Sequence, residues 1–138
     1  MTDNISSNAS TASRDDGASG AFFKLRGTLP RNATISEYFY FYENGAYMAV
    51  ADLDWKMTFR ADLEQDNADF TLSTDDATLV TTTDNDGNPV LHMTVAVGTF
   101  SNARGDYTTD LASKDSNDTV VLWAHGITSF TRNPVTWS

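Results

Sequence analysis

The sequence predicts an all-β protein, folded as an antiparallel β-sandwich, and three observations support this. Of the 19 acidic residues only three are glutamate, and aspartate favours turns whereas glutamate tolerates helices. Threonine, which favours strands, is abundant. From Phe22 onward, apolar and polar residues alternate with the period of two that marks a half-buried strand. Turn-forming residues interrupt the alternation about every ten residues, as in sandwiches and small barrels.

One of the first expected strands contains a run of five aromatic residues. Residues 22–26, FFKLR, form a short strand by their alternation. In the run YFYFY, residues 38–42, the two phenylalanines point to one face and the three tyrosines to the other. The dipeptide Asn44-Gly45 is a strong hairpin signal, so a returning strand is expected over residues 46–51.

The middle of the chain continues the alternation. In residues 54–63, DWKMTFRADL, the residues expected to face the core are Trp55, Met57, Phe59, Ala61 and Leu63. Residues 68–73, ADFTLS, repeat the pattern with Ala68, Phe70 and Leu72 facing inward. Residues 77–83, ATLVTTT, alternate more weakly, which predicts an edge strand.

Three further segments complete the strand prediction. Residues 90–97 are expected to bury Leu91, Met93, Val95 and Val97. Residues 105–113 place Tyr107, Thr109 and Leu111 on one face. Residues 118–130 are apolar on both faces around Val121 to Trp123, as in a central strand. A weak helical signal, enough for one turn, lies in residues 98–104.

About eight or nine short strands of this kind predict a sandwich that is immunoglobulin-like in general form, with a small barrel as the alternative. We expect an extended N-terminal arm over residues 1–20 and a β-sandwich domain over residues 21–138. The arm is rich in Ser, Asn, Ala, Asp and Gly, and Ile5 is its one large aliphatic residue beyond the initial methionine. Such a segment does not fold alone, so we expect a neighbouring subunit to order it.

Composition and charge argue against several classes of partner. The net charge is −10, whereas a protein that binds a phosphate backbone needs clustered Lys and Arg. The absence of cysteine excludes disulfide scaffolds, thiolate catalysis and Cys-based zinc sites. No apolar run approaches the roughly 20 residues of a membrane span, and the start MTDNISSNAS lacks the features of a secretory signal. We expect no nucleic acid and no membrane as partner.

Candidate catalytic and metal-ligating residues are few. His92 and His125 are the only histidines, and no carboxylate lies at a short, ligand-like spacing from either. We expect one exposed and one hydrogen-bonded histidine, with a metal-binding pair as the alternative. The segment DNDGN, residues 84–88, resembles the start of a calcium loop, but Met93 stands where that pattern requires Glu. An Asp-Gly hairpin turn is favoured there, and calcium in an acidic loop is the alternative.

Motifs of enzymes are absent from the sequence. It contains no dinucleotide-binding GxGxxG, no phosphate-binding GxxxxGK[ST] and no nucleophile-elbow GxSxG. The tripeptide Arg104-Gly105-Asp106 occurs in some integrin ligands, but here it is expected to shape the turn before a strand. We therefore expect no enzyme, no cofactor and no resident metal.

The tyrosines of the aromatic run are the candidate binding surface. Tyrosine is enriched in protein interfaces, so we favour a protein contact, or a second core layer, for Tyr38, Tyr40 and Tyr42. The alternative is a carbohydrate-binding module that stacks sugars on these rings together with Trp55 or Trp137. A membrane anchor is disfavoured in an acidic chain without basic flanks.

The second half of the chain contains a series of strand and turn residues that together form a pattern: Asp52-Leu53, Arg60, residues 105–111, Gly126-Ile127-Thr128 and Val135-Thr136. Over roughly residues 50–136 this pattern resembles the small immunoglobulin-like domain at the start of phage baseplate upper proteins and in related small virion proteins. The aromatic run and the Ser/Asn-rich arm depart from that family's pattern. The resemblance implies a non-enzymatic virion structural protein, made in the host cytoplasm. It would be an adaptor or decoration module on tail, neck or capsid that anchors a fibre.

The expected contacts with partners lie in two places. The first comprises the arm and the adjoining strand, through Ile5, Phe22, Phe23 and Leu25. The second is the outward tyrosine face described above. The expected partners are other virion proteins, namely capsid, neck, tail or fibre subunits. Many copies in a symmetric assembly would multiply contacts that are individually weak.

Overall fold

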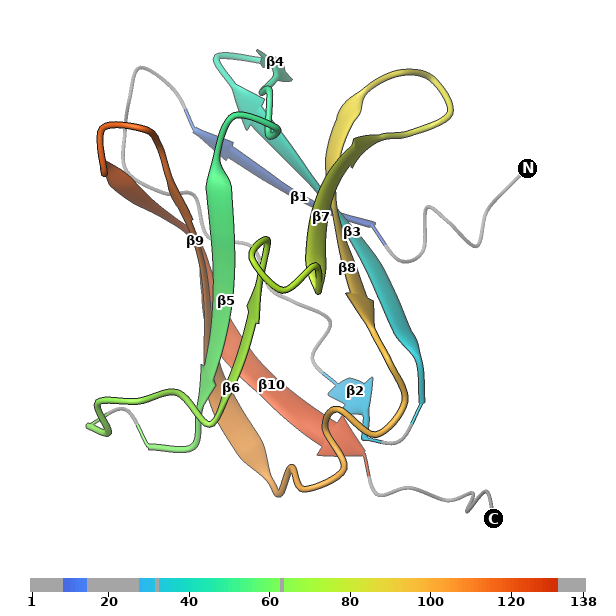
Figure 1. Cartoon of the computed structure of the whole chain (residues 1–138), viewed down its shortest axis with the longest axis vertical. Helices are drawn as coiled ribbons and strands as arrows, with labels where there is room; N and C mark the ends of the chain where they lie inside the picture. The colour runs from blue at the N-terminus through green and yellow to red at the C-terminus, as the bar shows by residue number, and fades with distance from the viewer. Residues whose placement is uncertain (1–8, 15–27, 32, 63, 132–138) are drawn as a thin grey trace.

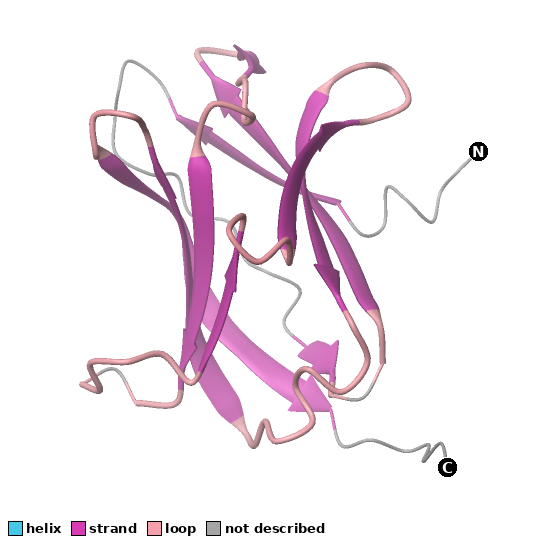
Figure 2. Ribbon diagram, in the orientation of Figure 1, coloured by secondary structure: helices cyan, strands magenta, loops and turns pink. Residues whose placement is uncertain are grey.

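The computed structural model describes residues 9–14, 28–31, 33–62 and 64–131. Within these residues every regular element is a β-strand, which confirms the prediction of an all-β fold. The ten strands of this part divide between two five-stranded sheets (Figures 1 and 2). The sheets share one hydrophobic core, so the fold is sandwich-like and not the small closed barrel that was the alternative.

The first sheet contains the aromatic run. β3 (Ile35–Glu43) pairs antiparallel with β8 (Pro89–Val95), which pairs antiparallel with β7 (Leu79–Thr83) at the edge. β4 (Ala46–Tyr47) returns antiparallel along the last residues of β3. β1 (Ala9–Arg14) pairs with the opposite side of β3 and runs parallel to it. The tyrosine-bearing strand therefore lies inside the sheet, with neighbours on both sides.

The second sheet has the order β2-β10-β9-β5-β6. β10 (Val120–Thr131), β9 (Asp106–Lys114), β5 (Asp54–Arg60) and β6 (Phe70–Ser73) pair antiparallel. β2 (Thr28–Pro30) pairs parallel with the end of β10. Consecutive strands beyond β4 alternate in pairs between the two sheets, so every loop between the pairs crosses from one layer to the other (Figure 1).

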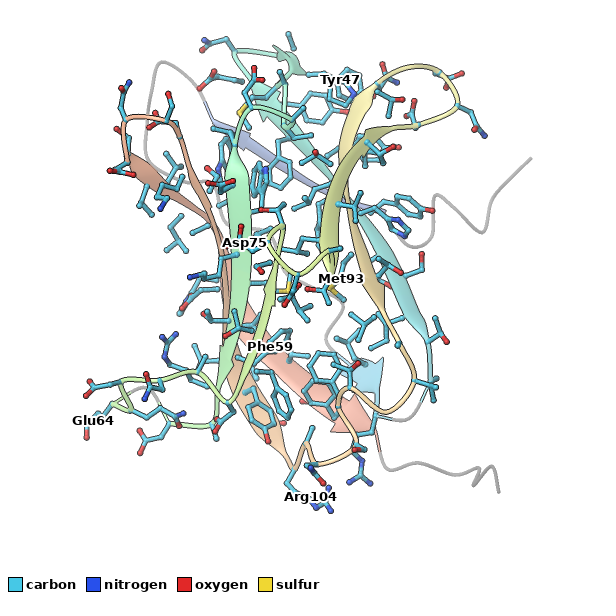
Figure 3. The ribbon with its side chains drawn as sticks, in the orientation of Figure 1. Tyr47, Phe59, Glu64, Asp75, Met93 and Arg104 are labelled. Carbon is cyan, nitrogen blue, oxygen red and sulfur yellow. The ribbon has the colours of Figure 1, made fainter. Side chains whose placement is uncertain are left out.

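Aromatic side chains dominate the core. At one end the ring of Phe41 lies 4.4 Å from that of Trp55 and 5.1 Å from that of Trp123, which joins the two sheets. Each indole N–H has an acceptor, the Val50 carbonyl for Trp55 at 3.1 Å and the Ser113 hydroxyl for Trp123 at 2.9 Å. A second cluster of rings fills the other end: Phe59, Phe70, Phe100, Tyr107 and Phe130. Figure 3 shows Phe59 and Met93 in the space between the sheets.

The alternation predicts most of this core correctly. The expected inward residues that are buried are Trp55, Met57, Phe59, Leu72, Leu91, Met93, Val95, Tyr107, Thr109 and Leu111. The weak strand is an edge strand, β7, as expected. Phe70 is only half-buried but packs against the core. The predicted strand over residues 22–26 and the side chain of Leu63 lie outside the described residues.

Several strand ends differ from the prediction. The strand expected over residues 46–51 is only β4, because the chain leaves the first sheet after Tyr47 and crosses to β5. Ala61 is exposed and not in the core, since β5 ends one residue earlier and the Ala61 N–H bonds to Asp69 Oδ2 in the next loop at 2.8 Å. Ala68 is half-buried and precedes β6.

Two predictions in the last third are also corrected. Val97 is 57% exposed, because β8 ends at Val95 and the chain then turns at Gly98, whose φ is 92°. Residues 98–104 form turns and not a helical turn, although they bury Phe100 in the core. The apolar stretch of β10 around Val121 pairs with β9 on one side, whereas β2 reaches only the last three residues of β10.

Candidate functional site

Five rings on the outer face of the first sheet each contact another ring of the set. They are Tyr38, Tyr40 and Tyr42 of β3, Tyr47 of β4 and His92 of β8, and we call them the aromatic strip. The phenylalanines that alternate with the tyrosines are fully buried, so the tyrosines point away from the core as the sequence predicts. The strip combines β3 with its hairpin partner β4 and with β8, which is distant in the sequence and is a neighbour only in the folded sheet.

Tyr38 and His92 form a stacked pair across β3 and β8. Their backbones are directly paired, and their ring centroids are 4.4 Å apart with an interplanar angle of 4°. His92 Nε2 is 2.7 Å from Ser36 Oγ, and this hydrogen bond fixes the orientation of the imidazole. Burial lowers the pKa of His92 below its ordinary value of 6.5, so the ring is neutral at neutral pH.

Tyr40 is fixed by the hairpin between β7 and β8. Its hydroxyl donates to Asp84 Oδ2 at 2.9 Å. Burial, and then the hydrogen bond and negative charge of Asp84, raise the pKa of Tyr40 to about 12. Backbone N–H donation from Asn88, followed by the bond from Tyr40, lowers the pKa of Asp84. Val90, which alternates with the inward Leu91 of β8, is also buried.

The β3–β4 hairpin places Tyr42 beside Tyr47. Asn44 and Gly45 have φ values of 53° and 82°, the pair of positive angles that a type I′ turn requires. This two-residue turn sets Tyr42 opposite Tyr47, with ring centroids 4.7 Å apart. A hydrogen bond with Tyr47 and burial raise the pKa of Tyr42. Tyr47 is 41% exposed and lies at the β4 end of the molecule in Figure 3.

The structure brings together only part of the predicted contact residues. Tyr38, Tyr40 and Tyr42 share one face, whereas the side chains of Ile5, Phe22, Phe23 and Leu25 lie outside the described residues. Their roles in partner binding stay predictions. Of the predicted arm, Ala9–Arg14 form β1 and pair with β3 of the same chain.

Sequence reasoning missed two members of this surface, Tyr47 and the stacked His92, and one hydrogen bond. Tyr47 could have been found, because a two-residue turn at Asn44-Gly45 automatically sets it opposite Tyr42. His92 alternates with the inward Leu91 and Met93, but nothing in the sequence pairs it with Tyr38. The bond from Tyr40 to Asp84 joins residues 44 positions apart and has no sequence signal.

The second histidine lies on the outer face of the other sheet. His125 Nδ1 of β10 is 2.5 Å from Asp110 Oδ1 of β9, and both side chains are partly exposed. The expectation of one exposed and one hydrogen-bonded histidine is therefore too simple, because both are hydrogen-bonded. Ser36 with His92 and Asp110 with His125 each provide two members of an acid–base arrangement on the outer face of a sheet.

The acidic turns are held by their own hydrogen bonds. In the turn at residues 84–88, Asp84 Oδ1 accepts the N–H groups of Asp86 and Asn88, each at 2.9 Å, and Gly87 has a φ of 84°. This is the hairpin turn that the Asp-Gly signal predicts. Among the described residues, no group of three or more His, Asp or Glu side chains is placed to hold a metal ion.

Arg104-Gly105-Asp106 forms a turn before β9, as expected. The Arg104 guanidinium donates to the carbonyl of Ala103 at 2.8 Å, and Asp106 Oδ1 accepts the hydroxyl of Ser129 at 2.6 Å. Gly105 has a φ of 75°, which favours glycine there. Both charged side chains of the tripeptide are thus bound to neighbouring parts of the fold.

A shallow pocket of about 200 Å³ lies at the end of the second sheet where β5, β9 and β10 meet. Its lining includes Lys56 and Lys114 together with Asp54 and Asp75, so it carries balanced charge. It is separate from the aromatic strip, which belongs to the other sheet. No helix in the described part of the chain is long and apolar enough to cross a membrane.

Comparison with protein-family models and with curated proteins finds no match to this chain.

Proposed function

We propose that the chain is a non-enzymatic docking module that attaches to another protein through the aromatic strip. The observation that carries this proposal is the set of rings on the outer face of the first sheet, of which His92 and Tyr40 are fixed by hydrogen bonds with Ser36 and Asp84. Rigid aromatic side chains lose little conformational entropy on binding and are enriched at interface hot spots. Rings set along the outer face of a sheet suit a protein surface better than a small substrate, which needs a concave site.

The fold we propose for this module is immunoglobulin-like, and the strand order supports it. The orders β3-β8-β7 and β10-β9-β5-β6 correspond to B-E-D and G-F-C-C′ of a variable-type sandwich. Trp55 is buried on the strand equivalent to C. Tyr107, at the start of the strand equivalent to F, accepts the Arg104 N–H at 3.0 Å, the arrangement of a tyrosine corner. β1 departs from that fold, because it runs parallel to β3.

The setting we propose is a phage particle, with the chain as an adaptor or decoration module on tail, neck or capsid. This part rests on the resemblance over roughly residues 50–136 and on no structural observation. In that setting the part of the predicted arm that precedes β1, residues 1–8, binds a neighbouring virion subunit, while the strip makes a second contact. Repetition of both contacts around a symmetric assembly raises the total affinity without requiring a tight single site.

Incorporation into particles tests the proposal. Tagged variants are expressed in host cells that assemble the particle, and the purified particles are assayed for the tag. Tyr38→Ser and Tyr47→Ser are expected to lower incorporation by about tenfold, the usual effect of losing an aromatic hot spot. Ile127→Ser is the matched control, since Ile127 is 63% exposed on the other sheet. Deletion of residues 1–8, which leaves β1 in place, is also expected to block incorporation. Wild-type levels for both tyrosine variants would contradict docking through the strip.

A carbohydrate-binding module is the second candidate, favoured by the exposure of Tyr47 and by the tilt of 33° between its ring and that of Tyr42. The geometry of Tyr38 opposes it. Adjacent strands lie about 4.8 Å apart, and the parallel rings of the paired residues Tyr38 and His92 are 4.4 Å apart. The face of each ring is therefore directed at the other ring, and the ring edges are directed outward. Sugars stack on ring faces. Binding of the isolated chain to a glycan array, lost in Tyr47→Ser, would favour this candidate over docking on protein.

A further inference from the structure

Basic residues are distributed unevenly between the two sheets. β3, β4, β7 and β8 contain no lysine or arginine, and within the first sheet the exception is Arg14 at the end of β1. The second sheet carries Lys56 and Arg60 on β5 and Lys114 on β9. Arg104 lies at the opposite end of the molecule from Tyr47 (Figure 3). Among the side chains that the structure describes, the outer face of the first sheet therefore lacks the cations that the second sheet carries.

Negative charge, in contrast, borders the strip. The β7–β8 hairpin carries Asp84 and Asp86, and Asp84 accepts the hydroxyl of Tyr40. The charge of Asp84 contributes to raising the pKa of both Tyr40 and Tyr42, so its field extends along β3. Asp86 is exposed at the tip of this hairpin, and its backbone N–H holds Asp84 in place.

We propose that the aromatic strip binds an arginine-rich, positively charged segment of a partner protein. This inference rests on the proposed docking function and names the chemistry of its partner. A guanidinium group stacks on a tyrosine ring and donates several hydrogen bonds in one plane. Tyr47 offers an exposed ring, and the hairpin carboxylates lie at the rim beside the bonded hydroxyl of Tyr40. Lysine provides a single charge without a planar face and fits this surface less well.

Titration of the full chain with short peptides tests this inference. The probes are a Gly-Ser peptide with several arginines and two matched peptides in which lysine or glutamate replaces arginine. Amide chemical shifts of the ¹⁵N-labelled protein report where each peptide binds. We expect the arginine peptide to shift the amides of residues 38–42, Tyr47 and His92, and to bind more tightly than the lysine peptide. Binding should weaken as salt rises from about 20 mM to about 150 mM, since the Debye length shortens.

Three variants distinguish binding at the aromatic strip from non-specific attraction of the arginine peptide to an acidic protein. Tyr47→Ser removes the exposed ring and Asp86→Asn removes one rim charge, and each is expected to raise the Kd about two- to fivefold. Asp66→Asn is the matched control, because it removes an equally exposed charge in the β5–β6 loop, away from the strip. It should leave the Kd of the arginine peptide unchanged.

The possible results distinguish this inference from the docking function. Equal weakening by Asp66→Asn and Asp86→Asn, or shifts confined to loops outside the strip, would overturn the inference in favour of non-specific charge attraction. Preference for the glutamate peptide, or no binding of the arginine peptide, would also overturn it. If tyrosine variants still lose particle incorporation in those cases, docking through the strip stands and its partner is not basic.

Discussion

Replacing Thr109 by valine is expected to destabilise the fold by leaving one buried hydroxyl without a partner. Thr109 of β9 and Thr128 of β10 are 1% and 0% exposed, and their Oγ1 atoms are 2.8 Å apart. Thr109 donates its own proton to the Tyr107 carbonyl at 3.3 Å, so the hydroxyl of Thr128 is the donor between the two threonines. Valine keeps the shape of threonine but accepts no hydrogen bond.

The magnitude follows from the burial of the hydroxyl that remains. A buried polar group left unsatisfied costs about 1–3 kcal/mol, and neither hydroxyl can reach solvent here. Thr109→Val should therefore lower the free energy of unfolding by about 1–3 kcal/mol. Thr128→Val should cost less, because the Thr109 hydroxyl keeps the Tyr107 carbonyl as its acceptor. The double variant removes both polar groups and should cost less than the sum of the two, with a coupling energy of about 1–2 kcal/mol.

Urea unfolding of the four proteins measures this cycle. The buried Trp55 and Trp123 report unfolding by fluorescence, and the transition midpoint gives the free energy where the slope is unchanged. Serine at each position serves as the control, since it keeps the hydroxyl and loses a methyl group. Strictly additive valine effects would refute the reasoning, because they would mean that the two hydroxyls do not interact in the folded protein.

Three further predictions concern the aromatic strip. Gly45→Ala meets no atom within 4 Å but places a side chain at φ 82°, so it should cost about 1–2 kcal/mol of unfolding free energy by chemical denaturation; no loss would argue against the type I′ turn. The pKa of His92 is lowered in the folded protein, so near pH 6.5 the unfolded chain binds more protons than the folded one. The free energy of unfolding should therefore fall as the pH decreases through 6.5, and it should level off below the pKa of the folded state. His92→Gln should remove this dependence from pH-resolved thermal melts, and an unchanged slope would assign it to other groups. Tyr40→Phe removes one donor to Asp84, so the carboxyl pKa of Asp84, followed by ¹³C NMR, should rise toward its ordinary value; an unchanged pKa would contradict the bond.

The core could be predicted from the sequence because strand periodicity is local. Side chains alternate between the two faces of a strand whatever lies beside it, so the inward positions of β5 and β8 follow from residue type alone. The positions of two turns could also be predicted from the sequence, since Asn44-Gly45 and the Asp-Gly turn contain positive φ angles that few residues adopt. Strand ends were harder, because they depend on where the chain crosses between sheets. This is why Ala61 and Val97 are exposed despite fitting the pattern.

The candidate site was predictable only in part. The outward direction of the tyrosines follows from the buried phenylalanines between them, and Tyr47 follows from the hairpin register. The stack on His92 and the bond to Asp84 depend on β8 lying next to β3 in one particular register. A shift of that register by one residue would turn His92 toward the core.

The amino-acid sequence by itself determined the class of the fold, the alternation that builds the core and the turns that separate the strands, since each of these depends on residues close together in the chain. Only the tertiary structure decided which strands are neighbours. It brought Ser36 to His92 across 56 residues and Tyr40 to Asp84 across 44. The pairing of distant strands is selected by the packing of the whole core. Bringing distant strands together costs chain entropy, and only the complete set of core contacts compensates for that cost.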